Sequence, residues 1–186
     1  MFPILVEGPA VEPVSLADMK AYLRVDDDAE DDLIAGLVKA ARLVVETASR
    51  RVLVAQKWRL LLHAWPPSRS IALPLSPLIA VEKIEVFDEA GIATPLAADA
   101  FEVDSLQDPP LVWFNATPEP GRSRHGIAID FRAGYGPAAE DVPATLRLAL
   151  KIIVAQWFEN RGDVAGVQNP PPEALALIAP FQRPRL

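Results

Sequence analysis

The chain has 186 residues, of which 51% are hydrophobic, and it carries a net charge of −7 and no cysteine. This length can bury one substantial core, or one core and a small satellite domain. The acidic charge argues against wrapping DNA or docking on an anionic membrane, although DNA could still slide past such a protein. Disulfides and thiol chemistry are excluded. We expect neither a membrane span nor a secretory signal, because apolar runs are short and the first residues lack a basic region.

The first segment is extended and leads into a short helix. Residues 1–13 are apolar and broken by prolines, so we expect them to lie across another surface. A short amphipathic helix is predicted over residues 15–25, where Ser15 and Asp18 resemble a capping box. Residues 26–32 form an acidic loop without the glycine and closing glutamate of a calcium loop, so helix-start electrostatics explain the charge better than a metal does.

Residues 31–51 predict the helix around which the chain is organised. Its apolar residues recur at helical spacing and share one face: Leu33, Ile34, Leu37, Val38, Ala41, Val45 and Ala48. Lys39, Arg42, Glu46 and Arg50 fall elsewhere on the helix, and we expect them to stay in water. The acids at the start and the two arginines at the end suit the helix dipole.

Residues 52–142 change to short, strand-like runs with turn signals between them. The runs cover residues 58–65, 71–75, 81–87, 101–103, 111–114 and 126–132. Pro74 breaks the second run, which we expect at a sheet edge or as an extended link. The pattern indicates a small antiparallel β module inserted between helices. Residues 133–136, Ala-Gly-Tyr-Gly, predict a tight turn, because no lysine follows as it would in a phosphate-binding loop.

A second strong helix is predicted over residues 143–161, apolar nearly all round and therefore central. Residues 173–178 predict a short helix, and residues 179–186 form a basic tail with prolines. The expected fold class is α+β, with a helical-bundle core of two long and two short helices and an inserted small antiparallel β module. We expect Leu33, Leu37, Ala41 and Val45 to pack against Leu146, Leu150, Ile153 and Trp157.

This pattern divides the chain into three stretches. Residues 1–51 form an N-terminal helical hairpin, residues 52–142 the inserted β module, and residues 143–186 the last core helix with its tail. Residues 143–161 then pack with residues 15–51 as one helical domain.

The residues give little support for catalysis. His63 and His125 are the only histidines, and neither lies in a motif with a nucleophile. Arg122, Ser123 and Arg124 precede His125 in a small basic loop. We interpret this loop as a hairpin tip, with contact to nucleic acid or to a neighbour's acids as the alternative. We expect no catalytic residue, no cofactor and no metal site.

Three stretches, taken in order, carry a family resemblance. They are SLADMKAYLRV at 15–25 with LIAGLVKAARLVVETASR at 33–50, IDFRAGYG at 129–136, and VPATLRLALKIIVAQWFENR at 142–161. In this order they resemble the head–tail connector (adaptor) proteins of long-tailed bacteriophages, including those of gene transfer agents. The resemblance covers roughly half of the chain, on both sides of the β module, and gives no role for that module.

The resemblance implies a structural role and no enzyme activity. It implies a ring of about twelve subunits beneath the portal that joins the capsid to the tail and lines the DNA channel. Its partners would be the portal protein, a stopper or tail-side neck protein and further copies of the chain. DNA would pass without specific binding, and no membrane would be involved. The protein would sit in the neck of a virion or phage-like particle, assembled in the bacterial cytoplasm.

The resemblance also suggests two sets of site residues. The portal-binding candidates are Pro180, Phe181, Gln182, Arg183, Pro184, Arg185 and Leu186; an aromatic residue with arginines suits a partner groove, and a disordered terminus is the alternative. The subunit-interface candidates are Arg42, Glu46, Arg50 and Arg161. The first three could instead face the channel, and Arg161 could instead balance the dipole at the end of its helix. Two other functions remain open, namely another neck or tail-completion protein (a stopper or tail terminator) and, with less support, a small hydrolase.

Overall fold

The computed structural model describes residues 3–160 and 170–182. It is a mixed α+β protein with antiparallel sheets, and it divides into two compact units. The β unit consists of Met1–Gly8 and Ala55–Tyr135, and the helical unit of Pro9–Val54 and Gly136–Leu186. The expected hairpin boundaries group residues 1–8 with the helices, whereas the structure places them with the strands. Within the described residues, no helix has the length and apolar character needed to cross a membrane.

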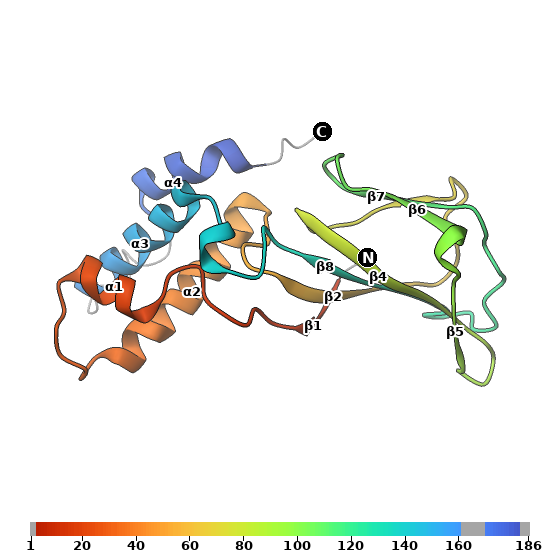
Figure 1. The fold of residues 1–186 in the computed structure, drawn as a ribbon, viewed down its shortest axis with the longest axis horizontal. Coiled ribbons are helices and arrows are strands. Elements are labelled where there is room, and N and C mark those ends of the chain that lie inside the picture. The colour runs from red at the N-terminus through yellow and green to blue at the C-terminus, as the bar shows by residue number, and fades with distance from the viewer. Residues whose placement is uncertain (1–2, 161–169, 183–186) are drawn as a thin grey trace. The chain divides into compact units, whose positions relative to one another are not determined.

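The helical unit contains the four α-helices of the described chain (Figure 1). They are α1 (Leu16–Leu23), α2 (Asp31–Ser49), α3 (Ala144–Glu159) and α4 (Pro172–Ile178), with short 3-10 turns η2 (Ala139–Asp141) and η3 (Ala179–Phe181). α3 packs against both α2 and α4. All four helices lie where the sequence pattern predicts them, and their ends differ by one or two residues.

The ends of α1 follow the sequence closely. The Ser15 hydroxyl oxygen accepts a hydrogen bond from the backbone N–H of Asp18 at 3.0 Å, which satisfies one of the free donors of the first turn. The helix stops at Arg24, whose φ of 58° places it in the left-handed region. The N–H groups of Arg24 and Val25 then turn back to the carbonyls of Ala21 and Lys20.

The buried face of α2 is narrower than the expected one, since Ala41 and Val45 are buried as predicted but Leu33 and Leu37 are not fully buried. Its fully buried apolar residues are Ile34, Val38, Ala41 and Val45, and those of α3 are Leu146, Ala149, Leu150, Ile153 and Val154. The prediction that Leu33 packs in this core is wrong, because its side chain is 40% exposed. Leu33 and Ile34 are both apolar, so helical periodicity alone allowed either of two adjacent stripes.

The β unit contains two antiparallel sheets (Figure 1). The larger has the order β1-β2-β8-β4-β5 and the smaller the order β3-β7-β6. The strands are β1 (Ile4–Glu7), β2 (Gln56–Leu62), β3 (Ser70–Ala72), β4 (Leu78–Phe87), β5 (Ala93–Pro95), β6 (Phe101–Asp104), β7 (Leu111–Phe114) and β8 (Ile127–Ala133), with the short 3-10 turn η1 (Ala98–Ala100) before β6. β3 is an edge strand, as its proline-limited sequence predicts.

Two strands lie outside the predicted set. β1 pairs with β2 from Ile4 opposite Arg59, so the first segment joins a sheet and does not simply lie across a surface. β5 is only three residues long and ends in Pro95, a short edge strand whose proline has no backbone donor to offer another chain. Both are edge strands, which need less hydrophobic patterning than a central strand such as β8.

The turn after β8 uses its glycines in two different ways. Gly134 has a φ of 138°, so it supplies the backbone conformation that the sequence predicts. At Gly136 there is no room for a side chain, because a Cβ there would lie 2.2 Å from a carboxylate oxygen of Asp141. That carboxylate accepts a hydrogen bond from the N–H of Ala138 at 2.9 Å and so closes the turn leading into η2.

Candidate functional site

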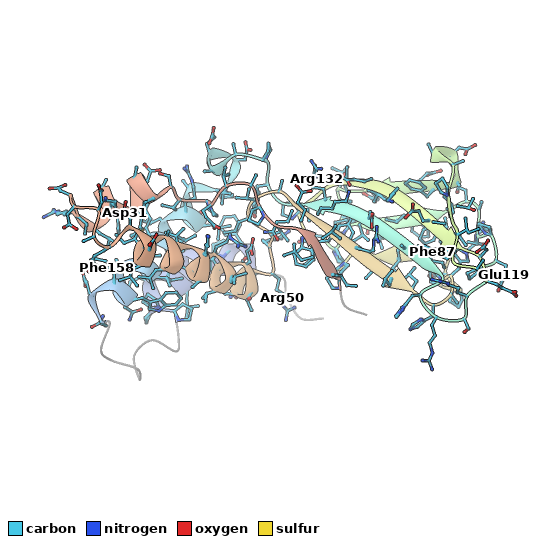
Figure 2. The ribbon with its side chains drawn as sticks, turned by 90° about the horizontal axis from the view of Figure 1, so that it is seen from below. Asp31, Arg50, Phe87, Glu119, Arg132 and Phe158 are labelled. Atoms are coloured by element: carbon cyan, nitrogen blue, oxygen red, sulfur yellow. The ribbon has the colours of Figure 1, made fainter. Side chains whose placement is uncertain are left out.

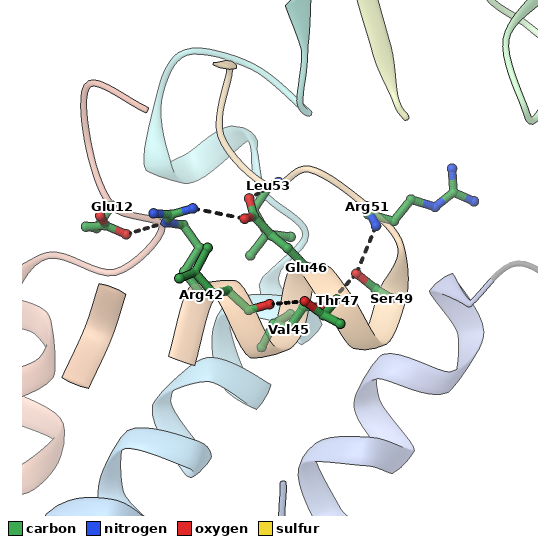
Figure 3. A network of polar contacts seen from close by, with 9 residues as sticks. Glu12, Arg42, Val45, Glu46, Thr47, Ser49, Arg51 and Leu53 are labelled. Atoms are coloured by element: carbon green, nitrogen blue, oxygen red, sulfur yellow. Dashed lines mark hydrogen bonds and ion pairs between the residues drawn. The ribbon is translucent and has the colours of Figure 1, made fainter. Parts of the chain in front are cut away.

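A network around Arg42 organises the helical unit (Figure 3). Arg42 donates from Nε to Glu12 Oε2 at 2.8 Å and from Nη1 to Glu46 Oε2 at 2.9 Å. The other carboxylate oxygen of Glu46 accepts the backbone N–H of Leu53 at 2.9 Å. The network therefore ties the segment before α1 and the segment after α2 to the middle of α2.

The position of Arg42 corrects one expectation. The residue is only 9% exposed, so the prediction that it stays in water is wrong. Glu12 lies far away in the sequence, and its approach gives the guanidinium a partner that helical periodicity cannot reveal. Because Arg42 and Glu46 bind each other inside the unit, their charges are already engaged within one chain.

We expect Glu46→Ala to lower the free energy of unfolding of the helical unit by about 1–3 kcal/mol. The substitution removes the acceptor for the Leu53 N–H and one of the two carboxylates bound to Arg42. Urea unfolding followed by far-UV circular dichroism measures the effect. Glu46→Gln, which keeps an acceptor oxygen, should lose less, and the exposed neighbour Thr47→Ala should stay within about 0.5 kcal/mol. Equal losses for Ala and Gln would contradict the role of that oxygen.

The C-terminal candidates begin beside the end of α2. Ala174 and Ile178 of α4 are fully buried, so this helix is fixed by packing. Arg51 donates from Nε to the backbone carbonyl of Phe181 at 3.2 Å, while Pro180 and Gln182 are exposed. The packing of α4 and the Arg51 hydrogen bond therefore anchor the C-terminal segment as far as Phe181. The candidates Arg183, Pro184, Arg185 and Leu186 lie outside the described residues.

The remaining interface candidates lie at helix ends. Arg50 is exposed at the C-terminal end of α2, with a left-handed φ of 58°, and Figure 2 shows it at the opposite end of this helix from Asp31. Arg161 lies outside the described residues. The structure thus brings Arg42 and Glu46 together and leaves Arg50 apart from them.

The acidic loop has a local structural use. Lys20 of α1 donates to Asp28 Oδ1 and to Asp31 Oδ1, both at 2.7 Å, and so links α1 to the start of α2. These hydrogen bonds raise the pKa of Lys20 to about 12 and lower the pKa of Asp28. Within the described residues, no cluster of histidines and carboxylates could hold a metal ion.

The central strand of the β unit carries a nearly buried carboxylate. Asp130 of β8 is 1% exposed and accepts two hydrogen bonds from Arg59 of β2, at 2.6 Å from Nε and 2.8 Å from Nη2. Lys83 of β4 lies 3.8 Å away on the other neighbouring strand. The Arg59 hydrogen bonds lower the pKa of Asp130 although burial opposes them. Cross-strand register creates this arrangement, since Arg59, Asp130 and Lys83 stand opposite one another.

The two histidines, far apart in sequence, meet in the β unit. Their rings stack with centroids 5.0 Å apart, and the backbone N–H of His125 donates to His63 Nδ1 at 3.1 Å. None of the hydrogen bonds found in the described part of the chain joins either ring to a carboxylate. The pair lies just beyond the last paired residues of β2 and β8, Leu62 and Ile127. The loop that carries His125 joins β7 to β8, which belong to different sheets, so the interpretation of this loop as a hairpin tip is wrong. The base–orienter arrangement of a hydrolase is not present among the described residues.

A cavity of about 1010 Å³ opens in the β unit, between the β4–β5 hairpin and residues 116–121. Val86, Pro95 and Leu96 contribute an apolar lining, and Glu119 adds a carboxylate; Figure 2 labels Glu119 and Phe87 in this part of the unit. No sequence pattern predicts this cavity, because its lining comes from separate segments without a shared motif.

Comparison with known proteins identifies the class. Residues 13–92 match the family model described as phage gp6-like head–tail connector protein. This match includes α1, α2 and the first strands of the β unit after β1. None of the curated proteins matches the chain significantly.

Solved structures match over almost the whole chain. One, described as the neck of an empty GTA particle computed with C6 symmetry, has a TM-score of 0.84 and 26% identity and covers 100% of this chain and 97% of the other. A virion of a native gene transfer agent particle gives 0.84 and 27%, with the same coverage. The neck of a native GTA particle computed with C12 symmetry gives 0.75 and 28%, covering 98% and 97%. The resemblance seen in the sequence is thus confirmed: the chain is similar to head–tail connector proteins over residues 13–92 and to GTA particle components over almost its whole length, which supports a structural connector role.

Proposed function

We propose that this chain is one subunit of a ring in the neck of a virion or gene transfer agent particle, placed between the portal and the tail. The match that carries the proposal is the one with a neck component, which spans the whole chain at a TM-score of 0.84. The C12 symmetry of a further matching neck supports about twelve subunits. The ring is assembled in the bacterial cytoplasm, and its role is structural, with no enzymatic step.

The helical unit forms the bundle core of this ring. Two long helices, α2 of 19 residues and α3 of 16, pack together, and the short α1 and α4 cover them. The β module is inserted between α2 and α3. The net charge of −7 suits a channel wall along which DNA moves without being held. A stopper or tail terminator, expected to be dominated by strands, fits these helices less well.

The segment from Pro180 to Leu186 binds the portal. Arg51 and the packed helix α4 hold the start of this segment as far as Phe181, which gives it a fixed base. A rigid base lowers the entropy lost on binding. Arg50 and Arg161 contact the neighbouring subunit, while Arg42 and Glu46 stabilise the helix that presents Arg50.

The test is co-expression of this chain with the portal protein of the same particle. We expect the chain to co-sediment with the portal and to form a ring on it by electron microscopy. The combined variant Phe181→Ala, Arg183→Ala, Arg185→Ala should weaken this association at least about tenfold, because aromatic and arginine side chains dominate such contacts.

Two controls make the result interpretable. Glu173→Ala changes an exposed residue of α4 outside this segment and should bind normally, and circular dichroism should show that the triple variant keeps its helices. A natural chain that never associates with the portal, as a monomer or as a ring, overturns the proposed function. Normal binding by the triple variant overturns only the role of the tail.

A further inference from the structure

One face of α2 is exposed and is not covered by residues 3–160 or 170–182. Leu33, Gly36, Ala40 and Leu43 are spaced three and four residues apart, so they form a single stripe along the helix. Leu33 and Leu43 are 40% and 56% exposed. A Cβ added to Gly36 would meet nothing within 4 Å, so the middle of the stripe is open. This outer stripe lies opposite Ile34, Val38, Ala41 and Val45, which pack inside the unit.

The outer stripe has the form of a helix-packing surface. Leucines stand at two positions and small residues lie between them, which permits another helix to approach closely. Asp32 is exposed next to Leu33 and brings a negative charge to the start of the stripe. A surface that complements this stripe therefore presents an apolar side chain to the leucines and a cation to Asp32.

Such a surface exists on the other long helix of the same unit. Leu148 of α3 is 41% exposed and borders a cavity of about 230 Å³ that is also lined by two cations, Arg147 and Lys151, and by one carboxylate, Asp18. Arg147 Nε is buried and has no hydrogen-bond partner in the described structure. Lys151 Nζ lies 5.8 Å from the centre of the Tyr22 ring. We call this region the Leu148 surface.

We propose that the outer stripe of α2 in one copy docks on the Leu148 surface of a second copy. Leu33 and Leu43 then cover Leu148, and Asp32 approaches the positive charges of Arg147 and Lys151. The two surfaces are different, so the contact is head-to-tail and can repeat around an axis until it closes. This inference rests on the proposed ring, and it names the surfaces that join neighbouring subunits.

Cross-linking tests the proposal directly, because the natural chain has no cysteine. The full chain carrying Leu43→Cys and Leu148→Cys is assembled on the portal and treated with a short bis-maleimide reagent. We expect a ladder of cross-linked multimers. A mixture of the two single variants should give dimers and nothing larger, and each single variant alone should remain uncross-linked.

Substitution provides a second readout. Leu43→Asp should reduce ring formation at least tenfold and leave the circular dichroism and unfolding of the free chain unchanged, because the side chain is exposed. Lys39→Ala, exposed on α2 beside the stripe, is the matched control and should assemble normally.

The outcomes separate the two ideas. If the natural chain forms no ring on the portal, the proposed function fails and this inference fails with it. If a normal ring forms but the double-cysteine variant stays uncross-linked, or if Leu43→Cys cross-links to itself, only the head-to-tail contact is overturned. Cross-links from these cysteines to the portal would assign the surfaces to that partner and also overturn it.

Discussion

The variant Asp130→Asn is expected to lose about 3 kcal/mol of unfolding free energy in the β unit. Removing the carboxylate charge leaves Arg59 without its partner at a site where Asp130 is 1% exposed. The loss should fall at the lower end of the range for broken buried pairs, because the Arg59 side chain is 35% exposed and can turn toward water. Urea unfolding followed by tryptophan fluorescence measures it, since Trp58, Trp65 and Trp113 all lie in this unit.

The matched control for this variant is Glu82→Gln on the neighbouring strand β4. Glu82 binds Lys57 at 2.6 Å and Arg132 at 2.8 Å, but its side chain is 25% exposed. Solvent screening should hold the effect of this change below about 1 kcal/mol. If both variants lose the same unfolding free energy, burial of Asp130 does not explain how much its ion pair with Arg59 contributes to stability.

The same variant should respond to acid in a defined direction. The pKa of Asp130 is lower in the folded protein than in the unfolded chain, because Arg59 donates to the carboxylate. The ionised Asp130 carboxylate therefore contributes its full stabilisation above the pKa of the unfolded chain, about 3.9. This stabilisation is lost as the pH falls through the lower pKa of the folded protein. The stability gap between the natural chain and Asp130→Asn should be constant near pH 7 and shrink below about pH 4. A gap that persists in acid would contradict this linkage.

Leu150→Ala should lower the unfolding free energy of the helical unit by roughly 2–5 kcal/mol. Leu150 is fully buried on α3, which packs against both α2 and α4, so its truncation leaves a cavity in the core of the unit. Circular dichroism reports this unfolding, because the α-helices of the described chain all lie there. Leu148→Ala, two residues away and 41% exposed, should change stability by no more than about 0.5 kcal/mol. Similar losses from the two changes would contradict the observed packing of α3.

Elements with local signals were predictable. α1 is marked by Ser15 with Asp18 and stops at Arg24, and β7 occupies 111–114 as its apolar run predicts. The strand β1 was missed because its partner β2 lies some fifty residues further along the chain, and prolines on both sides give it an irregular pattern. Sequence patterns report local preference, whereas edge strands depend on pairing with a distant neighbour.

The candidate site was less predictable than the fold. Periodicity correctly marks α2 as amphipathic but does not choose between the stripe that contains Leu33 and the stripe that contains Ile34; the contact with α3 decides. Arg42 is buried because Glu12 approaches from outside the helix. The stacking of His63 on His125 likewise depends on strand register, which no local motif encodes.

The path of the chain through its two units has a consequence for folding speed. α2 and α3 pack together, yet the stretch Ala55–Tyr135 separates the two segments of the helical unit, and Val54 and Gly136 meet there in a parallel bridge. Closing a flexible loop of that length costs on the order of 4 kcal/mol in chain entropy. A β unit that forms first brings its two ends together and removes most of this cost before the helices meet. The early-folding β unit then holds α2 and α3 close together, which shortens the effective sequence separation of their contacts and speeds the folding of the helical unit.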